Sequence, residues 1–358
     1  MPRRLPHTAR APRPTIGLIT DNIHLGVGAT LWSGVLRAAA DADVNVLCLP
    51  GGALNPPAPG SVPATGPGPG AVVPDTPRGG VHELVSPELL DGAICWSSTL
   101  GLPTPPGTAG AALAERLGRL RAVVSLNSPL DDHETLLLDG YTGMRRLIAH
   151  LATVHGLRRL VCIRGPLTNR VSAERYRAFT DALERHGLPQ DRSLVAAALG
   201  FGPGAGAAAM RILLDVRGLR PGRDFDAVVA CSDALGADAL RLLNQRGIRV
   251  PSEVALVGFN DSVEARITDP PLTSVSLPFA ELGALAVQTV AARLRGTAPP
   301  ARRVVPGSLV TRRSCGCRAP LVGQGAAGPP HGGHRPAGRP ARAGRDATGP
   351  EGTGAAGT

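Results

Sequence analysis

The stretch that decides the fold is Asp226–Ser262, which reads DAVVACSDALGADALRLLNQRGIRVPSEVALVGFNDS. It opens with Ala227–Ala230, a short apolar run with the length and composition of a buried strand. A helical pattern follows over Ala234–Arg246 and ends at Gly247. A second apolar run, Val254–Val257, predicts the next strand. A strand–helix–strand unit of this kind indicates a parallel sheet with helices on its faces.

The same alternation continues in both directions along the chain. Further strands are predicted at Thr15–Thr20, Val44–Leu49, Gly92–Cys95, Ala122–Leu126, Arg159–Ile163, Leu194–Ala198, Thr273–Ser276 and Ser308–Thr311. Further helices are predicted at Gly28–Asp41, Ala111–Leu120, Asp139–His155, Val171–His186, Gly204–Arg217 and Phe279–Arg295. Ligands of such sheets bind beyond the carboxyl ends of the strands. Polar residues just after each strand are therefore the first candidates for a binding site.

Composition limits the classes of function. The chain has 358 residues and a net charge of +10, and all of its basic residues are Arg. Residues 1–14 and 318–358 carry +4 and +3 of that charge, so the body of the chain is only weakly basic. The sequence contains no apolar run of membrane-spanning length and no apolar core of a secretory signal near its start. We therefore expect a cytoplasmic protein that does not insert into a membrane.

Three segments lack apolar periodicity. Residues 1–14 are rich in Pro and Arg, and residues 50–80 hold 9 Pro and 8 Gly. Residues 318–358 are rich in Gly, Pro and Arg, as a disordered tail or a shifted reading frame would be. Such segments bury too little apolar surface to order themselves. The first is expected to be a disordered basic N-terminus, the second a disordered insertion and the third a solvated tail.

Six motifs in order carry a family resemblance. They are TIGLITDN, LLLDGYTGMRRLIAHLATVHGLRRLVCIRGP, SAERYRAFTDALERHGL, the stretch quoted above, PPLTSVSLPFAELGALAV and GSLVTRRSC. Together they resemble the effector-binding core of the LacI/GalR family, which has the fold of type I periplasmic binding proteins. The resemblance covers residues 15–317. It implies two doubly wound α/β lobes with parallel sheets, joined by three crossing segments, with a small ligand in the cleft between them.

By this resemblance the N-terminal lobe comprises residues 15–157 and 278–305. The C-terminal lobe comprises residues 158–277 and 306–317. Family repressors begin with a helix-turn-helix, whereas residues 1–14 show no helical pattern. The expected function is therefore a ligand-sensing domain of a LacI/GalR-type regulator without its own DNA-binding domain. It would bind a sugar, polyol or nucleobase-like effector by lobe closure and form a homodimer. The alternatives are a solute-binding protein of a transporter, or a sensor module detached from a larger signalling protein.

Two polar residues are the leading ligand candidates. Arg175 shares a helix face with Val171, Phe179 and Ala182, and a charge on an apolar face needs an acceptor. Asn260 follows a predicted strand, although GFND is also good turn chemistry. The resemblance places both at ligand-contacting positions of the family.

Further candidates come from helix starts and strand ends. Asp139 opens a helix and would serve as an N-cap, and the resemblance also places it at a ligand contact. Ser232 or Asp233 caps the next helix, and the resemblance makes Asp233 the ligand contact. Asn22 follows the first strand and is a weaker candidate. Aromatic residues that would stack on a ligand or pack between elements are Trp96, Trp32 and Phe279.

The sequence offers no enzymatic site. It lacks a nucleophile paired with a His, a phosphate loop and a cluster of metal ligands, so we expect no catalytic residue, no cofactor and no metal. Cys315 and Cys317 have no His or Cys partners nearby in the sequence, and they are interpreted as an incidental pair. The other four cysteines are expected to be buried free thiols.

The first prediction concerns DNA. The chain of 358 residues should bind DNA only weakly, through its terminal Arg clusters, because no DNA-reading element is recognised in it. In a filter-binding titration, affinity should fall steeply with salt and be the same for unrelated sequences. A sequence-specific footprint that persists at physiological salt would contradict this expectation.

Overall fold

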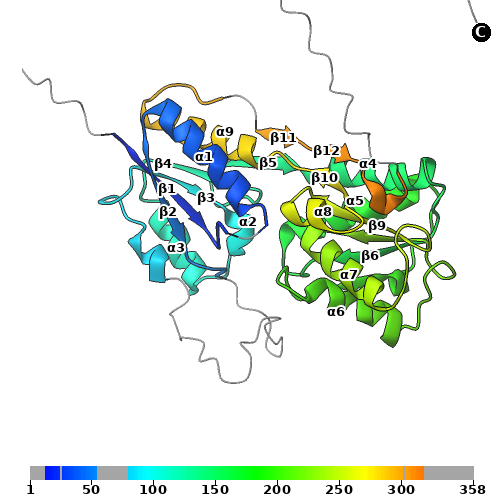
Figure 1. Cartoon of the computed structure of the whole chain (residues 1–358). Helices are drawn as coiled ribbons and strands as arrows, with labels where there is room; N and C mark the ends of the chain where they lie inside the picture. The colour runs from blue at the N-terminus through cyan, green and yellow to red at the C-terminus, as the bar shows by residue number, and fades with distance from the viewer. Residues whose placement is uncertain (1–12, 25, 55–79, 301–302, 318–358) are drawn as a thin grey trace, which may run out of the picture. The chain divides into compact units, whose positions relative to one another are not determined.

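Two six-stranded sheets organise the chain in the computed structural model, which describes residues 13–24, 26–54, 80–300 and 303–317 (Figure 1). The sheets have the orders β2-β1-β3-β4-β5-β11 and β7-β6-β8-β9-β10-β12. In each sheet the strand order changes direction at the strand that comes first in the chain, β1 or β6. This is the arrangement of a doubly wound sheet. The predicted α/β fold with two doubly wound lobes is confirmed.

The first lobe is built on the first sheet, all of whose pairings are parallel. Its strands are β1 (Thr15–Thr20), β2 (Asn45–Pro50), β3 (Gly92–Cys95), β4 (Ala122–Leu126), β5 (Glu134–Asp139) and β11 (Val304–Pro306). Its helices are α1 (Gly28–Ala42), α2 (Ser97–Leu100), α3 (Ala109–Leu117) and α9 (Phe279–Leu294), with the 3₁₀ helix η1 at Gly80–Leu84.

The second lobe is built on the second sheet, in which β12 is antiparallel to β10 and the other pairings are parallel. Its strands are β6 (Leu160–Arg164), β7 (Val195–Ala197), β8 (Ala227–Ala230), β9 (Ala255–Asn260), β10 (Thr273–Ser276) and β12 (Ser308–Val310). Its helices are α4 (Gly140–Thr153), α5 (Arg170–Arg185), α6 (Ala205–Arg211), α7 (Asp233–Gln245) and α8 (Val263–Ile267). Short helical turns are η2 (Arg192–Leu194), η3 (Ile212–Val216) and η4 (Arg313–Cys315).

The chain passes between the sheets three times. It leaves the first sheet after β5, returns between β10 and α9, and crosses again between β11 and β12. α4 follows the first crossing and packs against α5, β10 and β12. Asp139 and Leu277 therefore lie at crossings, where residues of both lobes meet. The predicted bound at residue 157 assigns α4 to the first lobe, whereas α4 packs on the second sheet. The bounds near residues 278 and 306 remain predictions.

Alternation along the strands sorts side chains to two faces of each sheet. In β1, Ile16 and Leu18 pack in one hydrophobic cluster with α1 and α9, whereas Ile19 packs in another with α3. Figure 1 shows α1 and α9 side by side along the first sheet. In β6, Cys162 packs with α4 and α5, and Val161 packs with α6 and α7. Both sheets are thus covered by helices on both faces.

The main differences from the prediction are short elements. β5 and β11 were not expected as strands, because the apolar run of β5 is only Leu136–Leu138 and β11 is three residues long. The predicted disorder of residues 1–14, 50–80 and 318–358 concerns residues that lie almost entirely outside the described ranges. Within the described helices, none is long and apolar enough to cross a membrane.

Two glycines set the distance between α1 and α9. A Cβ atom on Gly34 would overlap the carbonyl oxygen of Ala280, and one on Gly283 would lie 2.5 Å from the carbonyl oxygen of Leu31. Both obstacles are backbone atoms, which cannot rotate away. The two helices can therefore pack backbone to backbone only because these positions carry no side chain.

The second prediction tests this packing. Gly34→Ala should lower the free energy of unfolding by ~1–3 kcal/mol, because the added methyl group forces the two helices apart. Gly118→Ala is the matched control, since Gly118 is exposed, has φ −60° and leaves ordinary room for a Cβ atom. The control should be neutral or stabilising by up to ~1 kcal/mol. Equal urea midpoints for wild type and Gly34→Ala would show that the helices are not in this close contact.

Candidate functional site

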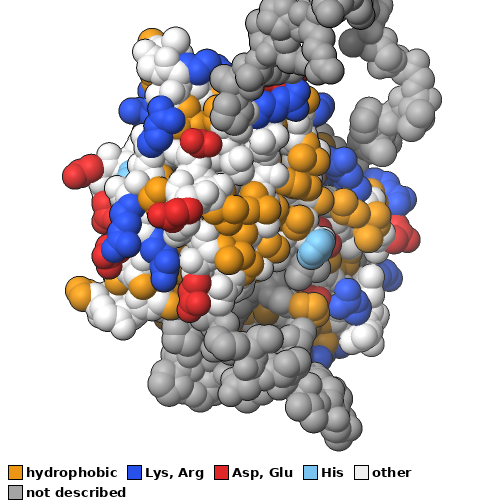
Figure 2. Space-filling view, turned by 90° about the vertical axis from the view of Figure 1, so that its left-hand side faces the viewer, with side chains coloured by type: hydrophobic (Ala, Val, Ile, Leu, Met, Phe, Trp, Pro, Cys, Tyr) orange, Lys and Arg blue, Asp and Glu red, His pale blue; other side chains and the backbone are white. Residues whose placement is uncertain are grey.

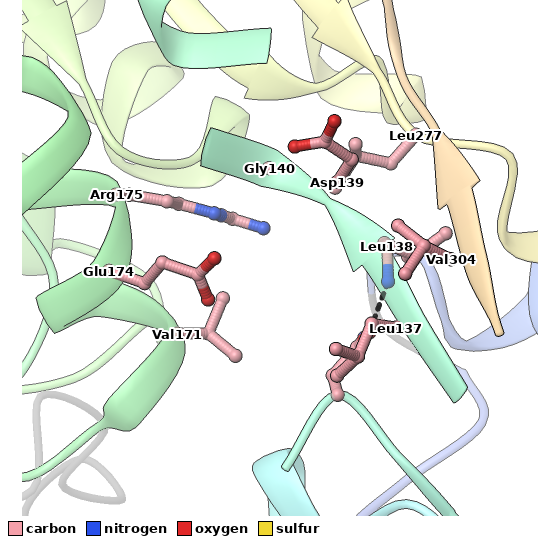
Figure 3. Close-up of a pocket in the computed structure, with 10 residues that line it drawn as sticks. Leu137, Leu138, Asp139, Gly140, Val171, Glu174, Arg175, Leu277 and Val304 are labelled. Carbon is pink, nitrogen blue, oxygen red and sulfur yellow. Dashed lines mark hydrogen bonds between the residues drawn. The ribbon is translucent and has the colours of Figure 1, made fainter. Parts of the chain in front are cut away.

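A cavity lies between β5 and α5 and encloses about 540 Å³ of unfilled space, part of it open to solvent. Its lining mixes apolar side chains with charged groups at Asp139, Glu174 and Arg175 (Figure 3). The other lining residues are Asn127, Leu137, Leu138, Gly140, Val171, Leu277 and Val304.

Asp139 stands at the end of β5 and at the start of α4. One of its carboxylate oxygens accepts a hydrogen bond from the backbone N–H of Thr142 at 2.8 Å, so the predicted N-cap is confirmed. A carboxylate has about four lone-pair sites, and one N–H uses only one of them. The capping bond therefore fixes the carboxylate at the pocket wall and leaves acceptor capacity for a ligand.

Arg175 is the most constrained charged residue of the pocket. Its side chain is 7% exposed, and its guanidinium lies over the ring of Phe259 at 4.2 Å. It donates to the carbonyl oxygen of Cys231 at 2.7 Å and to Oδ1 of Asn260 at 2.8 Å. Burial lowers the pKa of Arg175 to about 10, which still leaves it charged at neutral pH.

One donor of this guanidinium has no partner. Nε of Arg175 is buried and makes no hydrogen bond within the described parts of the chain. It faces Gly140 at the pocket wall, where an added Cβ atom would lie 3.9 Å from it. A buried charged donor that lacks an acceptor is unfavourable, so the site has a place for an additional acceptor.

Asn260 is brought to Arg175, as the sequence suggested, but it does not line the pocket. It ends β9 with φ 110°, a conformation that favours glycine, and Asp261 follows with φ 56°. The backbone strain is held in place by the hydrogen bond from Arg175. Asn260 thereby orients the guanidinium, and a direct contact with a ligand remains a prediction.

Asp233 lies away from the pocket and is 1% exposed. Its two oxygens accept hydrogen bonds from the backbone N–H of Ser262 at 2.8 Å and from the hydroxyl of Ser274 at 2.7 Å. Burial raises the pKa of the carboxyl group, and these hydrogen bonds oppose the rise. Ser232 is the cap of α7, because its hydroxyl accepts from the N–H of Leu235. Asp233 therefore links the start of α7 to the segment after β9 and to β10.

The aromatic candidates pack together. The rings of Trp96 and Phe279 are 5.9 Å apart, and both residues are buried in the core of the first lobe. Trp32 is half-buried and packs against the same core. None of the three lines the pocket. Nε1 of Trp96 is buried without a hydrogen-bond acceptor among the described residues.

Asn22 takes part in a polar cluster at the carboxyl end of β1. Its backbone N–H and side-chain amide donate to the carboxylate of Asp21 at 2.8 and 2.9 Å. Burial raises the pKa of Asp21, and hydrogen bonds involving Asn22, Thr99 and Thr20 oppose this rise. The cluster lies at a strand end, as expected for a polar site, but none of its members lines the pocket.

Two polar pocket residues escaped the sequence reading. Glu174 precedes Arg175 on α5, and Figure 3 shows its carboxylate directed toward β5. Asn127 follows β4 with φ 58°, and its Oδ1 accepts from the N–H of Leu138 at 2.9 Å. A polar residue directly after a strand was a usable signal for Asn127. Glu174 gave no signal, because a Glu on an exposed helix face is ordinary.

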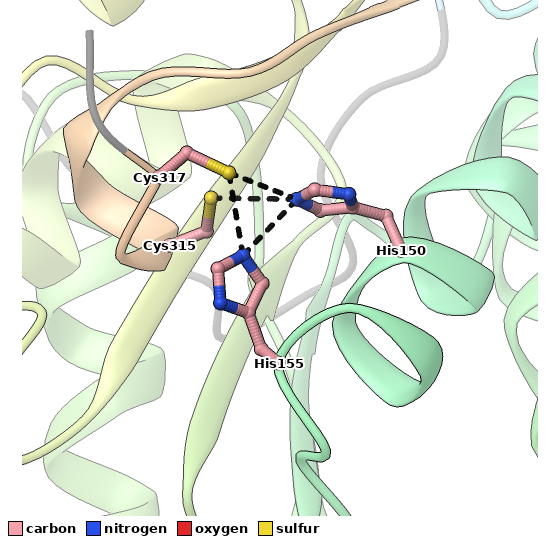
Figure 4. A group of neighbouring side chains, drawn as sticks. All are labelled: His150, His155, Cys315 and Cys317. Carbon is pink, nitrogen blue, oxygen red and sulfur yellow. Dashed lines mark hydrogen bonds between the residues drawn. The ribbon is translucent and has the colours of Figure 1, made fainter.

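The interpretation of Cys315 and Cys317 as an incidental pair assumed that any partners would lie nearby in the sequence. That assumption was wrong. His150 and His155, more than 150 residues earlier, lie beside them (Figure 4). The four ligand atoms are all within 4.8 Å of one another. Sequence separation hid the cluster, because only the packing of α4 against the second sheet brings its parts together.

Comparisons with known proteins agree with this architecture. Residues 148–315 match the family model described as periplasmic binding protein-like domain. The HTH-type transcriptional regulator CelR of Thermobifida fusca is 37% identical over 178 residues, which are 49% of this chain and 50% of that protein. DegA of Bacillus subtilis is 29% identical over 194 residues, or 54% of this chain and 55% of that protein. The chain thus spans about half the length of these curated relatives.

Solved structures cover more of the chain. A protein of the LacI family from Sanguibacter keddieii is 30% identical, with a TM-score of 0.64 over 85% of this chain and 100% of that one. The CelR–cellobiose complex is 27% identical, with a TM-score of 0.64 over 84% of this chain and 85% of that one. The named curated relatives are transcriptional regulators, which agrees with the expectation of a non-enzymatic chain.

The third prediction tests the strain at residue 260. Asn260→Ala and Asn260→Gly both remove the acceptor of Arg175, but only glycine adopts φ 110° freely. The Gly variant should therefore be more stable than the Ala variant by ~1 kcal/mol in urea unfolding.

Asn244, an exposed residue of α7, provides the control. There the order should reverse, because glycine is less favourable than alanine in a helix by ~1 kcal/mol. Finding Ala at least as stable as Gly at position 260 would mean that the backbone is not held in this conformation.

Proposed function

We propose that the chain is the periplasmic-binding-protein-like domain of a LacI-family regulator and that it senses a sugar in the pocket between β5 and α5. In this proposal Asp139 and Arg175 contact the ligand directly. Asn260 positions Arg175. Ligand binding draws the two lobes together and changes the output of the regulator.

The observation that carries the proposal is the incomplete pairing of Arg175. Its guanidinium is buried, two of its nitrogens are held by Cys231 and Asn260, and Nε has no acceptor in the described structure. Burying a charge is unfavourable, and this charge is buried at the wall of a cavity. A ligand oxygen at Nε would complete the hydrogen bonding.

The chemistry of the lining favours a sugar among the possible effectors. A sugar hydroxyl both donates and accepts, so it can bridge a carboxylate and a guanidinium at once. Asp139 and Glu174 offer acceptors and Arg175 offers donors in the same cavity, with apolar contacts from Leu137, Val171 and other side chains. Support also comes from CelR, which has been solved in complex with cellobiose. We therefore propose a carbohydrate of mono- or disaccharide size, in preference to a nucleobase.

The named relatives also bear on the output. They are transcriptional regulators, which favours a cytoplasmic sensor coupled to DNA over a transporter's solute-binding protein. We propose that DNA is read by a separate domain, as the sequence suggested, and that the sensor pairs with a second copy of itself. Figure 2 shows hydrophobic side chains gathered on one face of the molecule, a surface composition suited to self-association. Leu36 of α1, 47% exposed, is one large apolar residue open to solvent in the described first lobe.

The fourth prediction separates ligand binding from folding. Asp139→Asn keeps a good N-cap, because Asn and Asp cap helices about equally well, so stability should change by less than ~0.5 kcal/mol. It replaces a charged acceptor by a neutral one, and the affinity for the sugar should fall about tenfold, or ~1.4 kcal/mol. A thermal-shift screen of sugars identifies the ligand, and calorimetry then compares the variants.

Asp191→Asn is the matched control, because Asp191 caps η2, is exposed and does not line the pocket. It should bind the sugar like wild type. If a sugar binds and Asp139→Asn has the affinity of wild type, this pocket is not where the sugar binds. If no sugar in the screen binds but a nucleobase does, the pocket assignment survives and the ligand class changes.

A further inference from the structure

A second constellation of residues lies in the second lobe, apart from the pocket. His150 is in the last turn of α4, and His155 follows two residues after the helix ends. Cys315 ends η4, and Cys317 is the last described residue of the chain. Figure 4 shows both imidazole rings and both sulfur atoms directed at a common point. None of these residues lines the ligand pocket.

Four of the six distances between the ligand atoms match a tetrahedron around one metal ion, and all six are within 4.8 Å. Zn–N bonds of about 2.0–2.1 Å and Zn–S bonds of about 2.3 Å require separations of roughly 3.3 Å between two nitrogens and roughly 3.5 Å between nitrogen and sulfur. The two Nε2 atoms are 3.2 Å apart. Cys317 Sγ is 3.4 Å from each of them, and Cys315 Sγ is 3.6 Å from Nε2 of His150.

The fold prepares this arrangement on both sides. The histidines are separated by four residues, within the spacing of histidine pairs in zinc sites. The cysteines are separated only by Gly316, which is closer than in zinc fingers. Gly316 has φ 98°, which a residue with a side chain rarely adopts, and this turn brings both sulfurs to the same side.

The cysteine segment is also anchored independently. The buried hydroxyl of Ser314 donates to the carbonyl oxygen of Leu256 and accepts from the N–H of Thr273 at 2.8 Å. The hydroxyl of Thr273 in turn donates to Cys315 Sγ at 3.0 Å. Hydrogen bonds to a ligating sulfur are a common feature of metal sites and orient the ligand. Cys315 is therefore held in place by contacts with the second sheet.

We propose that His150, His155, Cys315 and Cys317 bind one Zn²⁺ ion as a closed structural site. Four protein ligands leave no open position for a substrate or water, which is the arrangement of structural and not catalytic zinc. Two thiolates and two neutral imidazoles give a donor set that suits Zn²⁺ better than Mg²⁺ or Ca²⁺, which prefer oxygen ligands.

A hydrogen-bonded network without metal explains the geometry less well. Two neutral imidazoles whose Nε2 atoms face each other can share only one hydrogen atom, and thiols are weak donors. In such a network, the convergence of four atoms on one point adds little favourable free energy. A metal ion gains from each of them, because every donor directs a lone pair at the same centre.

The site would fasten the end of the described chain to α4. This helix begins at Gly140 in the pocket wall and ends beside the metal ligands. Zinc would therefore fix the C-terminal segment to the helix that carries a pocket residue at its other end. The inference does not depend on the identity of the ligand or on the proposed sensing function.

The fifth prediction tests the site with the full chain, purified under reducing conditions and stripped with a chelator. Addition of Zn²⁺ should restore one bound ion per chain by elemental analysis and raise the melting temperature, because the ion binds the folded state. Co²⁺ should give the visible bands of tetrahedral cobalt and a thiolate-to-cobalt charge-transfer band in the near ultraviolet.

Cys317→Ser and His155→Gln should each weaken metal binding at least tenfold and abolish the shift in melting temperature. Cys48→Ser is the matched control, since Cys48 is a half-buried free cysteine of β2 outside the cluster. It should bind metal like wild type. Circular dichroism of each metal-free variant shows that it is folded.

The proposal is overturned if the reduced chain takes up neither Zn²⁺ nor Co²⁺. It is also overturned if Co²⁺ binds without the charge-transfer band, or if Cys317→Ser binds as tightly as wild type. Either result would assign the metal to other residues, such as the histidines His331 and His334.

Discussion

The structure around the pocket depends on the burial of one positive charge. The guanidinium of Arg175 lies against Phe259 and is held by the carbonyl oxygen of Cys231 and the side chain of Asn260. Each contact comes from a different point of the second sheet. The ends of β8 and β9 must therefore meet α5 in one arrangement for the charge to be tolerated. The strained backbone of Asn260 is part of that arrangement.

The topology supports the proposal that a ligand at this point changes the arrangement of the lobes. β5 ends in the first sheet at Asp139, and the next residue begins α4, which packs on the second lobe. Leu277 and Val304 of the pocket lining also lie at or near crossing segments. A ligand bound here touches the connections between the lobes. Closure of the lobes then needs small changes at few residues, because hinges concentrate motion at element ends.

The sequence predicted the fold well, because strand and helix patterns are local. Arg175 was recognised because a charge on an apolar helix face is unusual, and Asn260 because it follows a strand. Asp139 as a cap was also visible locally. Long-range contacts were not visible in the sequence: Trp96 and Phe279 pack on each other, and Asp233 accepts hydrogen bonds from Ser262 and Ser274. Contacts of these three residues with a ligand stay predictions. The cluster of His150, His155, Cys315 and Cys317 was missed for the same reason, since no local pattern brings its halves together.

The central claim is that a sugar completes the hydrogen bonding of Arg175. The most direct measurement is a crystal structure of the protein with the best-binding sugar. We predict a sugar oxygen within ~3.2 Å of Arg175 Nε and another within the same distance of the Asp139 carboxylate. A sugar bound elsewhere, or one that leaves Arg175 with only its contacts to Cys231 and Asn260, would contradict the account.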